Sequence, residues 1–197
     1  MSALHRRLAT LHAQGMTGPA PGLFPDPRSG RVERFKPAAV LCAITDRPDP
    51  GLLLIHRPGT MRAHAGQVAL PGGRIDLGEG VIDAAMREAQ EELGIDPALV
   101  RVIGMGDTFH TGSGYEVTPV LATVPAGIAI TPNPDEVADW FEAPLDYVLD
   151  RANHMIHAVE WEGELRYYVE ITWQGHRIWG VTGAILANLA QRLGWHD

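Results

Sequence analysis

The sequence predicts an α/β fold in which helices cover both faces of a mixed central sheet. Short apolar or alternating runs, bounded by turn-forming residues, recur between positions 38 and 179, as expected of strands. Two longer segments, 81–93 and 181–193, repeat apolar residues every three or four positions, as expected of amphipathic helices. Strands with interspersed helices are typical of an α/β sandwich.

The first 36 residues are expected to form an N-terminal lead-in. Residues 2–14 favour a short helix, whereas residues 15–37 are interrupted by prolines and glycines and should be irregular. The predicted α/β domain therefore occupies residues 37–197.

The domain is expected to begin with a strand pair. Residues 38–45 and 51–56 are apolar runs, and the sequence DRPDP between them favours a turn. The remaining predicted elements are strands over 67–70, 100–105 and 115–124, a stretch over 135–141 leading into a helix over 144–149, strands over 166–172 and 176–179, and a helix over 181–193.

Length and composition limit the class of protein. With 197 residues and 45% apolar composition, the chain can bury a sizeable core in one domain. A net charge of −8 argues against a general nucleic-acid binder, which would present a basic face. No apolar stretch approaches the roughly 20 residues that span a bilayer, and the N-terminus is too weakly apolar for a secretory signal, so a soluble cytoplasmic protein without a membrane partner is expected. The single cysteine, Cys42, lies in an apolar run and is expected to be a small buried hydrophobe.

Three glutamates crowd one side of the predicted helix over 81–93: Glu88, Glu91 and Glu92. Like charges three or four residues apart repel by roughly 0.2–0.5 kcal/mol per pair, and the negative end of the helix dipole disfavours them further. Arg87 is the only cation within reach on the helix. A divalent cation such as Mg²⁺ or Mn²⁺ would resolve the conflict, because these ions take hard carboxylate oxygens. The alternative is a solvated acidic face.

The spacing of these acids belongs to a longer pattern. The segment GRIDLGEGVIDAAMREAQEELGI, residues 73–95, resembles the Nudix box at every defining position. The resemblance implies a Nudix-type α/β/α sandwich, and an enzyme that cleaves a nucleoside diphosphate linked to another group by metal-assisted attack of water. The family's metal ligands correspond here to Glu88, Glu91 and Glu92, and the backbone carbonyl of Gly72 is a frequent addition.

Neighbouring residues are expected to support these carboxylates. Arg87 would orient them through charge-assisted hydrogen bonds, and Glu79 is expected to be a partner of Arg87 rather than a metal ligand. Gly72 and Gly73 would let the backbone approach the metal or the phosphates closely.

The resemblance does not fix the general base. Glu91 or Glu92 could serve if the metal does not saturate them, and Glu136, in the loop NPDEV, is a further candidate. The alternative for Glu136 is an ordinary exposed loop acid. His110 is a weaker candidate.

A second pattern lies upstream of the box. Residues 53–57 read LLIHR, Arg62 and Gly66 follow, and LPGG over 70–73 leads into the box. This resembles the signature of the coenzyme A pyrophosphatase branch of the Nudix family. Three positions depart from that signature: Ile55, Pro58 and Leu70.

The branch implies a substrate and residues that bind it. Coenzyme A carries a 3′-phosphate besides its diphosphate, and planar guanidinium groups bind phosphate in bidentate fashion. Arg57 and Arg62 are therefore expected to contact substrate phosphates, with His64 nearby and Gly73 against the substrate. Surface ion pairing is the alternative for the arginines. The expected products are 3′,5′-ADP and a 4′-phosphopantetheine product.

Two other functions stay open. The chain could be a Nudix hydrolase that acts on another nucleoside diphosphate derivative, or a non-catalytic Nudix module that binds a nucleotide. Modules of the second kind typically lose box carboxylates, and this chain keeps them. The resemblance also suggests a homodimer, for which Trp173 and Trp179 could supply an interface, although core packing is the more ordinary use of such rings.

Overall fold

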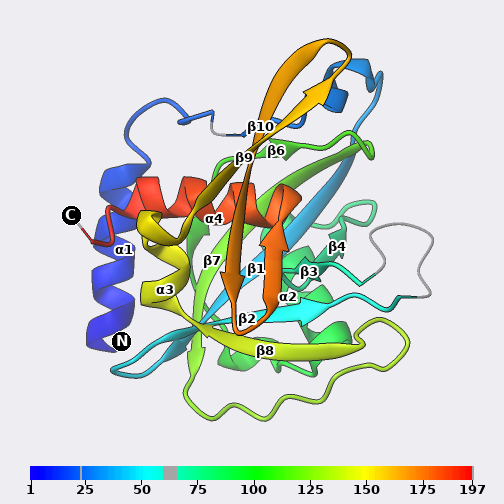
Figure 1. Cartoon of the computed structure of the whole chain (residues 1–197). Coiled ribbons are helices and arrows are strands. Elements are labelled where there is room, and N and C mark those ends of the chain that lie inside the picture. Colours follow the sequence, from blue (N-terminus) through cyan, green and yellow to red (C-terminus); the bar gives the residue numbers. More distant parts are fainter. Residues whose placement is uncertain (23, 60–65, 197) are drawn as a thin grey trace.

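The structure is a computed structural model, which describes residues 1–22, 24–59 and 66–196 (Figure 1). The strands are β1 (Lys36–Asp46), β2 (Gly51–His56), β3 (Val68–Ala69), β4 (Gly72–Arg74), β5 (Arg101–Met105), β6 (Phe109–His110), β7 (Tyr115–Pro125), β8 (Asp139–Pro144), β9 (Met155–Trp161), β10 (Glu164–Trp173) and β11 (His176–Trp179). The α-helices are α1 (Ala3–Gly15), α2 (Val81–Leu93), α3 (Leu145–Leu149) and α4 (Gly180–Leu193), and the short 3₁₀ helices are η1 (Pro27–Arg31), η2 (Pro97–Leu99) and η3 (Arg151–Asn153). Among the described residues, no helix is long and apolar enough to span a membrane.

The larger sheet has eight strands and is mixed. Its main path runs β3-β2-β1-β7-β5, with β4 paired to β1, β6 to β7 and β8 to β2. β1 and β7 run parallel from Lys36 opposite Tyr115 to Asp46 opposite Pro125, whereas the other described pairings in this sheet are antiparallel. The predicted mixed central sheet is confirmed.

Helices cover both faces of this sheet. Along β1, Leu41 and Ala43 face the side where α2 packs, while Cys42 and Ile44 face the opposite side. Helices α1, α3 and α4 lie on that opposite side together with the three-stranded sheet (Figure 1). Strands buried on both faces appear in a sequence as continuous apolar runs, which is why this strand is readily predicted.

Most predicted elements are confirmed close to their expected bounds, namely helices α1, α2 and α4 and strands β1, β2, β5, β7, β10 and β11. Cys42 is 1% exposed, and burial raises the pKa of its thiol to about 12. The interpretation of this residue as a small buried hydrophobe is therefore confirmed.

Four strands differ from the sequence prediction: β4, β6, β8 and β9. The stretch over 135–141 does not lead directly into a helix, because β8 pairs with β2 from Gly51 opposite Pro144 to His56 opposite Asp139. Pro144 consequently ends that strand and caps α3, instead of lying within its first turn. The pairing partner of β8 lies far away in the sequence, so local patterns do not reveal it.

The N-terminal segment packs onto the domain. Ser2 caps α1 by accepting a hydrogen bond from the backbone N–H of His5 at 3.0 Å, and Leu8 is fully buried at 0% exposure. From α4, Arg192 donates to the carbonyl of Gly15 at 2.6 Å. The domain boundary at residue 36 stays a prediction, but α1 contributes to the core on the α4 side of the sheet.

Candidate active site

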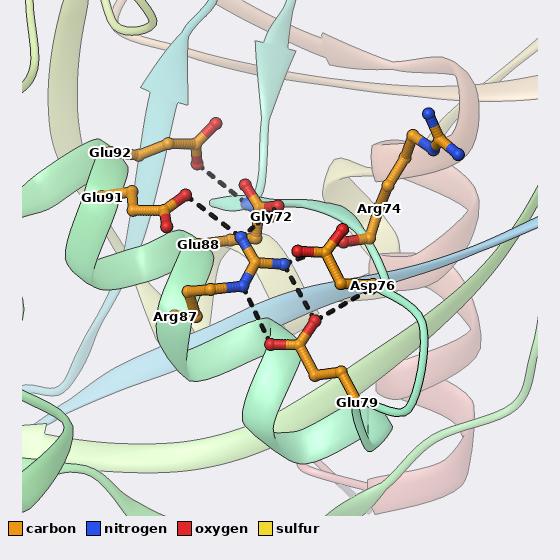
Figure 2. A network of polar contacts seen from close by, with 8 residues as sticks. All are labelled: Gly72, Arg74, Asp76, Glu79, Arg87, Glu88, Glu91 and Glu92. Carbon is orange, nitrogen blue, oxygen red and sulfur yellow. Dashed lines mark hydrogen bonds and ion pairs between the residues drawn. The ribbon is translucent and has the colours of Figure 1, made fainter.

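Helix α2 carries the acidic residues, as the sequence predicts. Ala89 and Leu93 are fully buried against the sheet, at 0% exposure, and Gly94 ends the helix with a φ of 69°, in the left-handed region. Burial of the apolar face fixes the rotation of the helix about its axis. Glu88 and Glu92 therefore point toward Gly72 on β4 (Figure 2).

Strand β4 lies close to both β1 and α2 because two glycines permit it. A Cβ on Gly72 would lie 2.3 Å from the carbonyl oxygen of Ala39, and a Cβ on Gly73 would lie 2.5 Å from the carboxylate of Glu88. Real Cβ atoms essentially never approach other atoms this closely. The glycines therefore place a peptide backbone directly against the Glu88 carboxylate.

Arg87 contacts three carboxylates at once (Figure 2). Its Nε and Nη2 donate to the two oxygens of Glu79 at 2.8 and 3.0 Å, which confirms the expected pairing. Its Nη1 donates to Glu88 at 2.9 Å and to Glu91 at 3.1 Å. The hydrogen bond to Glu79 is the main reason that the pKa of Arg87 is raised. One guanidinium thus fixes the orientation of the acidic side chains around it.

Glu92 is the most buried acid of this group, with 3% exposure. Its Oε2 accepts a hydrogen bond from the backbone N–H of Gly72 at 2.8 Å. Burial raises the pKa of Glu92 to about 8, opposed by the Gly72 hydrogen bond and by the charge of Arg57, and reinforced by the negative charges of Glu88 and Glu136. No ion pair to Glu92 is formed within the described part of the chain.

Glu88 and Glu91 differ in their exposure, at 15% and 50% of the side chain. Burial raises the pKa of Glu88 in spite of its contact with Arg87. In the ranges that the structure describes, no three acidic or histidine side chains already converge on one point that could hold a metal. Arg87 lies between Glu88 and Glu91 instead. The donor set still fits a hard divalent cation, because it offers carboxylate oxygens whose burial disfavours an unbalanced charge, and the exposed Glu91 has room to turn.

Arg57 follows β2 on the same side as these acids. Ile55 packs on the α2 side of the sheet, and the alternation of side chains continues that face to Arg57. The Arg57 Nε is buried and has no hydrogen-bond partner among the described residues. A buried guanidinium N–H without a partner, beside an acidic group, suits an anionic ligand. Arg62 and His64, the other two predicted substrate residues, lie outside the described residues.

The two candidate bases outside helix α2 have different surroundings. Glu136 is exposed in the loop before β8, and its charge raises the pKa values of Glu88 and Glu92. His110 contacts Glu116 instead, with 3.0 Å between its Nε2 and the carboxylate. Glu136 is therefore the candidate that lies close enough to the acidic residues to influence them.

The sequence pattern does not reveal the loop that holds Glu79. Oε2 of Glu79 accepts a hydrogen bond from the backbone N–H of Asp76 at 3.0 Å, and the carbonyl of Arg74 accepts one from Arg87 at 2.9 Å. Gly78 turns the loop with a φ of 84°. That glycine, in the run DLGE, is the one sequence signal that predicts a turn here. Backbone groups thus hold both partners of the Glu79 ion pair.

The chain is similar to known proteins over most of its length. The NUDIX domain family matches residues 35–161. A Photorhabdus laumondii protein named Nudix hydrolase NudL is 38% identical over 171 residues, which cover 86% of this chain and 91% of that protein. A Yersinia pestis protein of the same name is 41% identical over 158 residues, 79% of each chain. The solved structure of the Nudix hydrolase RenU from M. smegmatis is 27% identical, with a TM-score of 0.50, and the match covers 58% of this chain and 74% of that one.

Proposed function

This chain belongs to the Nudix hydrolase family, and on that premise we propose that it hydrolyses the diphosphate bond of coenzyme A or one of its derivatives. The products would be 3′,5′-ADP and a 4′-phosphopantetheine product. Family membership by itself supports the coarser statement that the substrate is a nucleoside diphosphate derivative. One observation carries the catalytic part of the proposal: the guanidinium of Arg87 is shared by Glu79, Glu88 and Glu91, while the buried Glu92 accepts a hydrogen bond from the backbone N–H of Gly72.

Nudix hydrolases need divalent metal ions, and we propose Mg²⁺ or Mn²⁺ for this chain. Glu88, Glu91 and Glu92 would hold the ion, together with the backbone carbonyl of Gly72. A bound ion supplies charge neutralisation at the diphosphate and a more acidic water. Arg87 would act as a positioning residue, because its donors are engaged by the carboxylates and by the carbonyl of Arg74.

The proton of the attacking water needs an acceptor, and we propose Glu136 for that role. Its carboxylate is exposed and lies beside the acidic residues of α2. Glu91 or Glu92 would serve instead if the metal leaves one of their oxygens free. In Glu136→Gln, we expect the rate to fall about 100-fold or more, because a positioned general base contributes roughly 10²–10⁴-fold, while the affinity for Mn²⁺ stays near that of the wild type. A rate within about 10-fold of the wild type would move the role to helix α2.

Support for coenzyme A comes from Arg57 and from the sequence around it. The buried Nε of Arg57 offers an unused donor, and a guanidinium binds phosphate in bidentate fashion. We propose that Arg57, Arg62 and His64 contact phosphates of the substrate, while the Gly73 backbone lies against it. A cytoplasmic location and the lack of a nucleic-acid partner stay predictions from the sequence.

A substrate panel tests the proposed reaction. Purified protein with Mn²⁺ is incubated with coenzyme A, ADP-ribose, NADH and dinucleoside polyphosphates, and the products are resolved by chromatography. We expect coenzyme A to give the highest kcat/KM and to yield 3′,5′-ADP. Preferred turnover of another panel member would replace the substrate and keep the reaction. Binding of nucleotide without turnover of any panel member would support a non-catalytic module.

The role of Arg57 is tested by comparing two substrates. In Arg57→Ala, we expect KM for coenzyme A to rise about 10-fold or more, since a charge-assisted hydrogen bond contributes roughly 1.5–3 kcal/mol. KM for 3′-dephospho-coenzyme A should change much less. Arg101→Ala, which changes an exposed arginine on β5, is the matched control. An equal loss on both substrates would assign Arg57 to the diphosphate and remove it as a reader of the 3′-phosphate.

A further inference from the structure

We propose that Trp140 binds the nucleobase of the substrate by stacking its indole ring against adenine. Trp140 lies on β8, the strand that pairs with β2 in the larger sheet (Figure 1). The inference rests on the proposed function, because it assigns a further part of the same substrate to this chain. It uses none of the carboxylates that would hold the metal.

Trp140 lies on the face of the sheet that carries the acidic residues. The register sets it opposite Ile55, and cross-strand partners point to the same face. Both residues belong to the apolar cluster on the α2 side, where Ile55 is fully buried and Trp140 is only partly buried. Trp140 is the one aromatic residue of that cluster among the described residues, whereas the cluster on the α4 side contains several. The active-site face thus offers one aromatic ring, part of which is open to solvent.

The other tryptophans are less available to a nucleotide. Trp173 lies in a stack of aromatic rings, and guanidinium carbons lie 4.7 Å from the Trp179 ring and 3.9 Å from the Trp195 ring. Trp173 and Trp179, which the sequence suggested for a dimer interface, are therefore engaged within the chain. Trp161 ends β9, in the hairpin that β9 forms with β10 on the opposite side of the larger sheet. Trp140 is the tryptophan whose position fits the site.

Arg57 is the diagonal neighbour of Trp140 across β2 and β8. The register continues past the ends of these strands, because the backbone N–H of Ala138 donates to the carbonyl of His56 at 2.9 Å. Ala138 consequently lies opposite Arg57, and Trp140 lies two residues further along the chain. Diagonal neighbours in an antiparallel pair are roughly 7–8 Å apart and within reach of long side chains. The charge of Arg57 also favours the ionised form of Glu92, so the arginine links the indole ring to the acidic group.

This arrangement fits a nucleotide that carries a 3′-phosphate. The base and the 3′-phosphate are attached to the same ribose ring, so a guanidinium that binds the phosphate leaves the base beside the neighbouring indole. Aromatic side chains bind bases by stacking, because every base has a π-face. A tryptophan suits this role, since its large ring has only two side-chain torsions to fix. Arg57 and Trp140 would therefore bind two groups of one nucleotide.

The loop before β8 fixes Trp140 relative to helix α2. The backbone N–H of Asn133 donates to the carbonyl of Glu92 at 2.9 Å, and that of Val137 donates to the carbonyl of Asn133 at 2.8 Å. Val137 is 2% exposed and anchors the loop in the apolar cluster on the α2 side. Glu136, the proposed general base, belongs to the same loop. The ring is therefore held in place before a ligand arrives, which lowers the entropic cost of binding.

Titration calorimetry with two nucleotides tests the role of Trp140. The nucleotides 3′,5′-ADP and AMP are titrated into the full chain with Mn²⁺ present. In Trp140→Leu, we expect the affinity for both to fall about 10-fold or more, because leucine keeps apolar bulk but has no π-face. Trp140→Phe keeps a ring and should stay within about 3-fold of the wild type. Trp161→Leu, the same change at an exposed tryptophan, is the matched control and should not alter the affinity.

The two nucleotides separate this proposal from the choice of coenzyme A. Affinity in Trp140→Leu within about 3-fold of the wild type would overturn the nucleobase site, as would a wild type that binds neither nucleotide. A ring that serves only to pack the core would lower the melting temperature and leave the affinity of the folded protein unchanged. A wild type that binds AMP as tightly as 3′,5′-ADP, with both affinities lowered in Trp140→Leu, would support Trp140 and argue against recognition of the 3′-phosphate.

Nuclear magnetic resonance of the wild type keeps the proposal falsifiable if Trp140→Leu fails to fold. The indole N–H resonance of Trp140 is identified as the one that is missing in Trp140→Phe, and that of Trp161 in the same way. Saturation with 3′,5′-ADP should shift the Trp140 resonance, because a stacked base changes the local magnetic field at the ring, and should leave the Trp161 resonance in place. An unshifted Trp140 resonance at saturation would contradict stacking on this ring.

Discussion

Two groups of charged residues in this protein set an arginine beside carboxylates, and they differ in how well the charges balance. On α4, Arg192 donates to both oxygens of Asp107, at 2.8 and 2.7 Å, and Asn188 donates a third hydrogen bond at 3.0 Å. Both ionised side chains are nearly buried, at 7% and 12% exposure. The Arg192 hydrogen bonds lower the pKa of Asp107.

The group on α2 is unbalanced by comparison. One guanidinium, that of Arg87, serves Glu79, Glu88 and Glu91, while Glu92 lies buried with a backbone N–H as its donor. The pKa of Glu92 is raised, in the direction opposite to that of Asp107. Removing one partner of a matched buried pair destabilises a fold, because the other charge is left uncompensated, whereas a buried carboxyl group without a matched cation is a candidate ligand site. Substitutions in the two groups should therefore have opposite consequences.

The largest effect is expected for Glu92→Gln. Loss of this carboxylate should lower kcat by about 1,000-fold, or about 4 kcal/mol in activation free energy, because it removes charge placed for the reaction. Glutamine keeps an oxygen that can accept the hydrogen bond from Gly72. The melting temperature measured with a chelator present should be unchanged or higher, because glutamine has no ionised form that burial would penalise. Activity within 10-fold of wild type would contradict the role of Glu92.

Asp107→Asn should show the reverse pattern. It leaves the buried Arg192 guanidinium without its ion pair, which costs about 3 kcal/mol of unfolding free energy and lowers the melting temperature by roughly 6–12 °C. The specific activity of the folded protein should stay near wild type. Calorimetry and the coenzyme A assay check the two halves of this prediction. Asp49→Asn, at an exposed loop aspartate, should leave both values unchanged.

A smaller effect is expected for Arg87→Lys. Lysine keeps the positive charge but cannot donate to Glu79 and Glu88 from a planar fork, so kcat should fall about 10- to 100-fold with little change in stability. Steady-state kinetics with Mn²⁺ in excess measures the loss. Arg101→Lys, on the exposed surface of β5, is the matched control. Wild-type kinetics in Arg87→Lys would show that charge alone suffices at this position.

The smallest effect is a pH dependence of the structural pair. The pKa of Asp107 is lowered from 3.8 in the fold, so its contribution is present above about pH 4 and is lost as the pH falls through the lowered value. The difference in unfolding free energy between wild type and Asp107→Asn should be full at about pH 6 and should shrink below about pH 4. Urea titrations over that range measure it. A gap that widens on acidification would reverse the assigned sign.

The comparison also separates what the sequence predicts from what it leaves out. The α2 site is predictable because its acids, arginine and glycines lie within residues 72–92, and a short helix fixes their relative positions. The Asp107 pair is not predictable, because Asp107 lies in the loop between β5 and β6, Arg192 lies on α4, and the two residues meet only in the folded protein. The same limit explains β8, which pairs with a distant strand.

Exposure is the other property that the sequence does not give directly. The hairpin strand β9 mixes apolar and polar residues on both faces, so it lacks the one-sided alternation that marks a half-buried strand. Glu162 and Gly163 both have positive φ in the turn that follows β9. The glycine is the local sequence signal that favours a hairpin there. The position of β9 at the edge of the three-stranded sheet follows only from the strand order in the folded protein.

Metal binding tests the contrast between the two groups most directly. Calorimetric titration of Mn²⁺ into the metal-stripped protein should show binding in wild type and in Asp107→Asn with equal affinity. In Glu92→Gln the affinity should fall by at least about 10-fold, because one hard oxygen donor has lost its charge. Equal Mn²⁺ affinity in wild type and Glu92→Gln would contradict the account of the unbalanced carboxylates as a metal site.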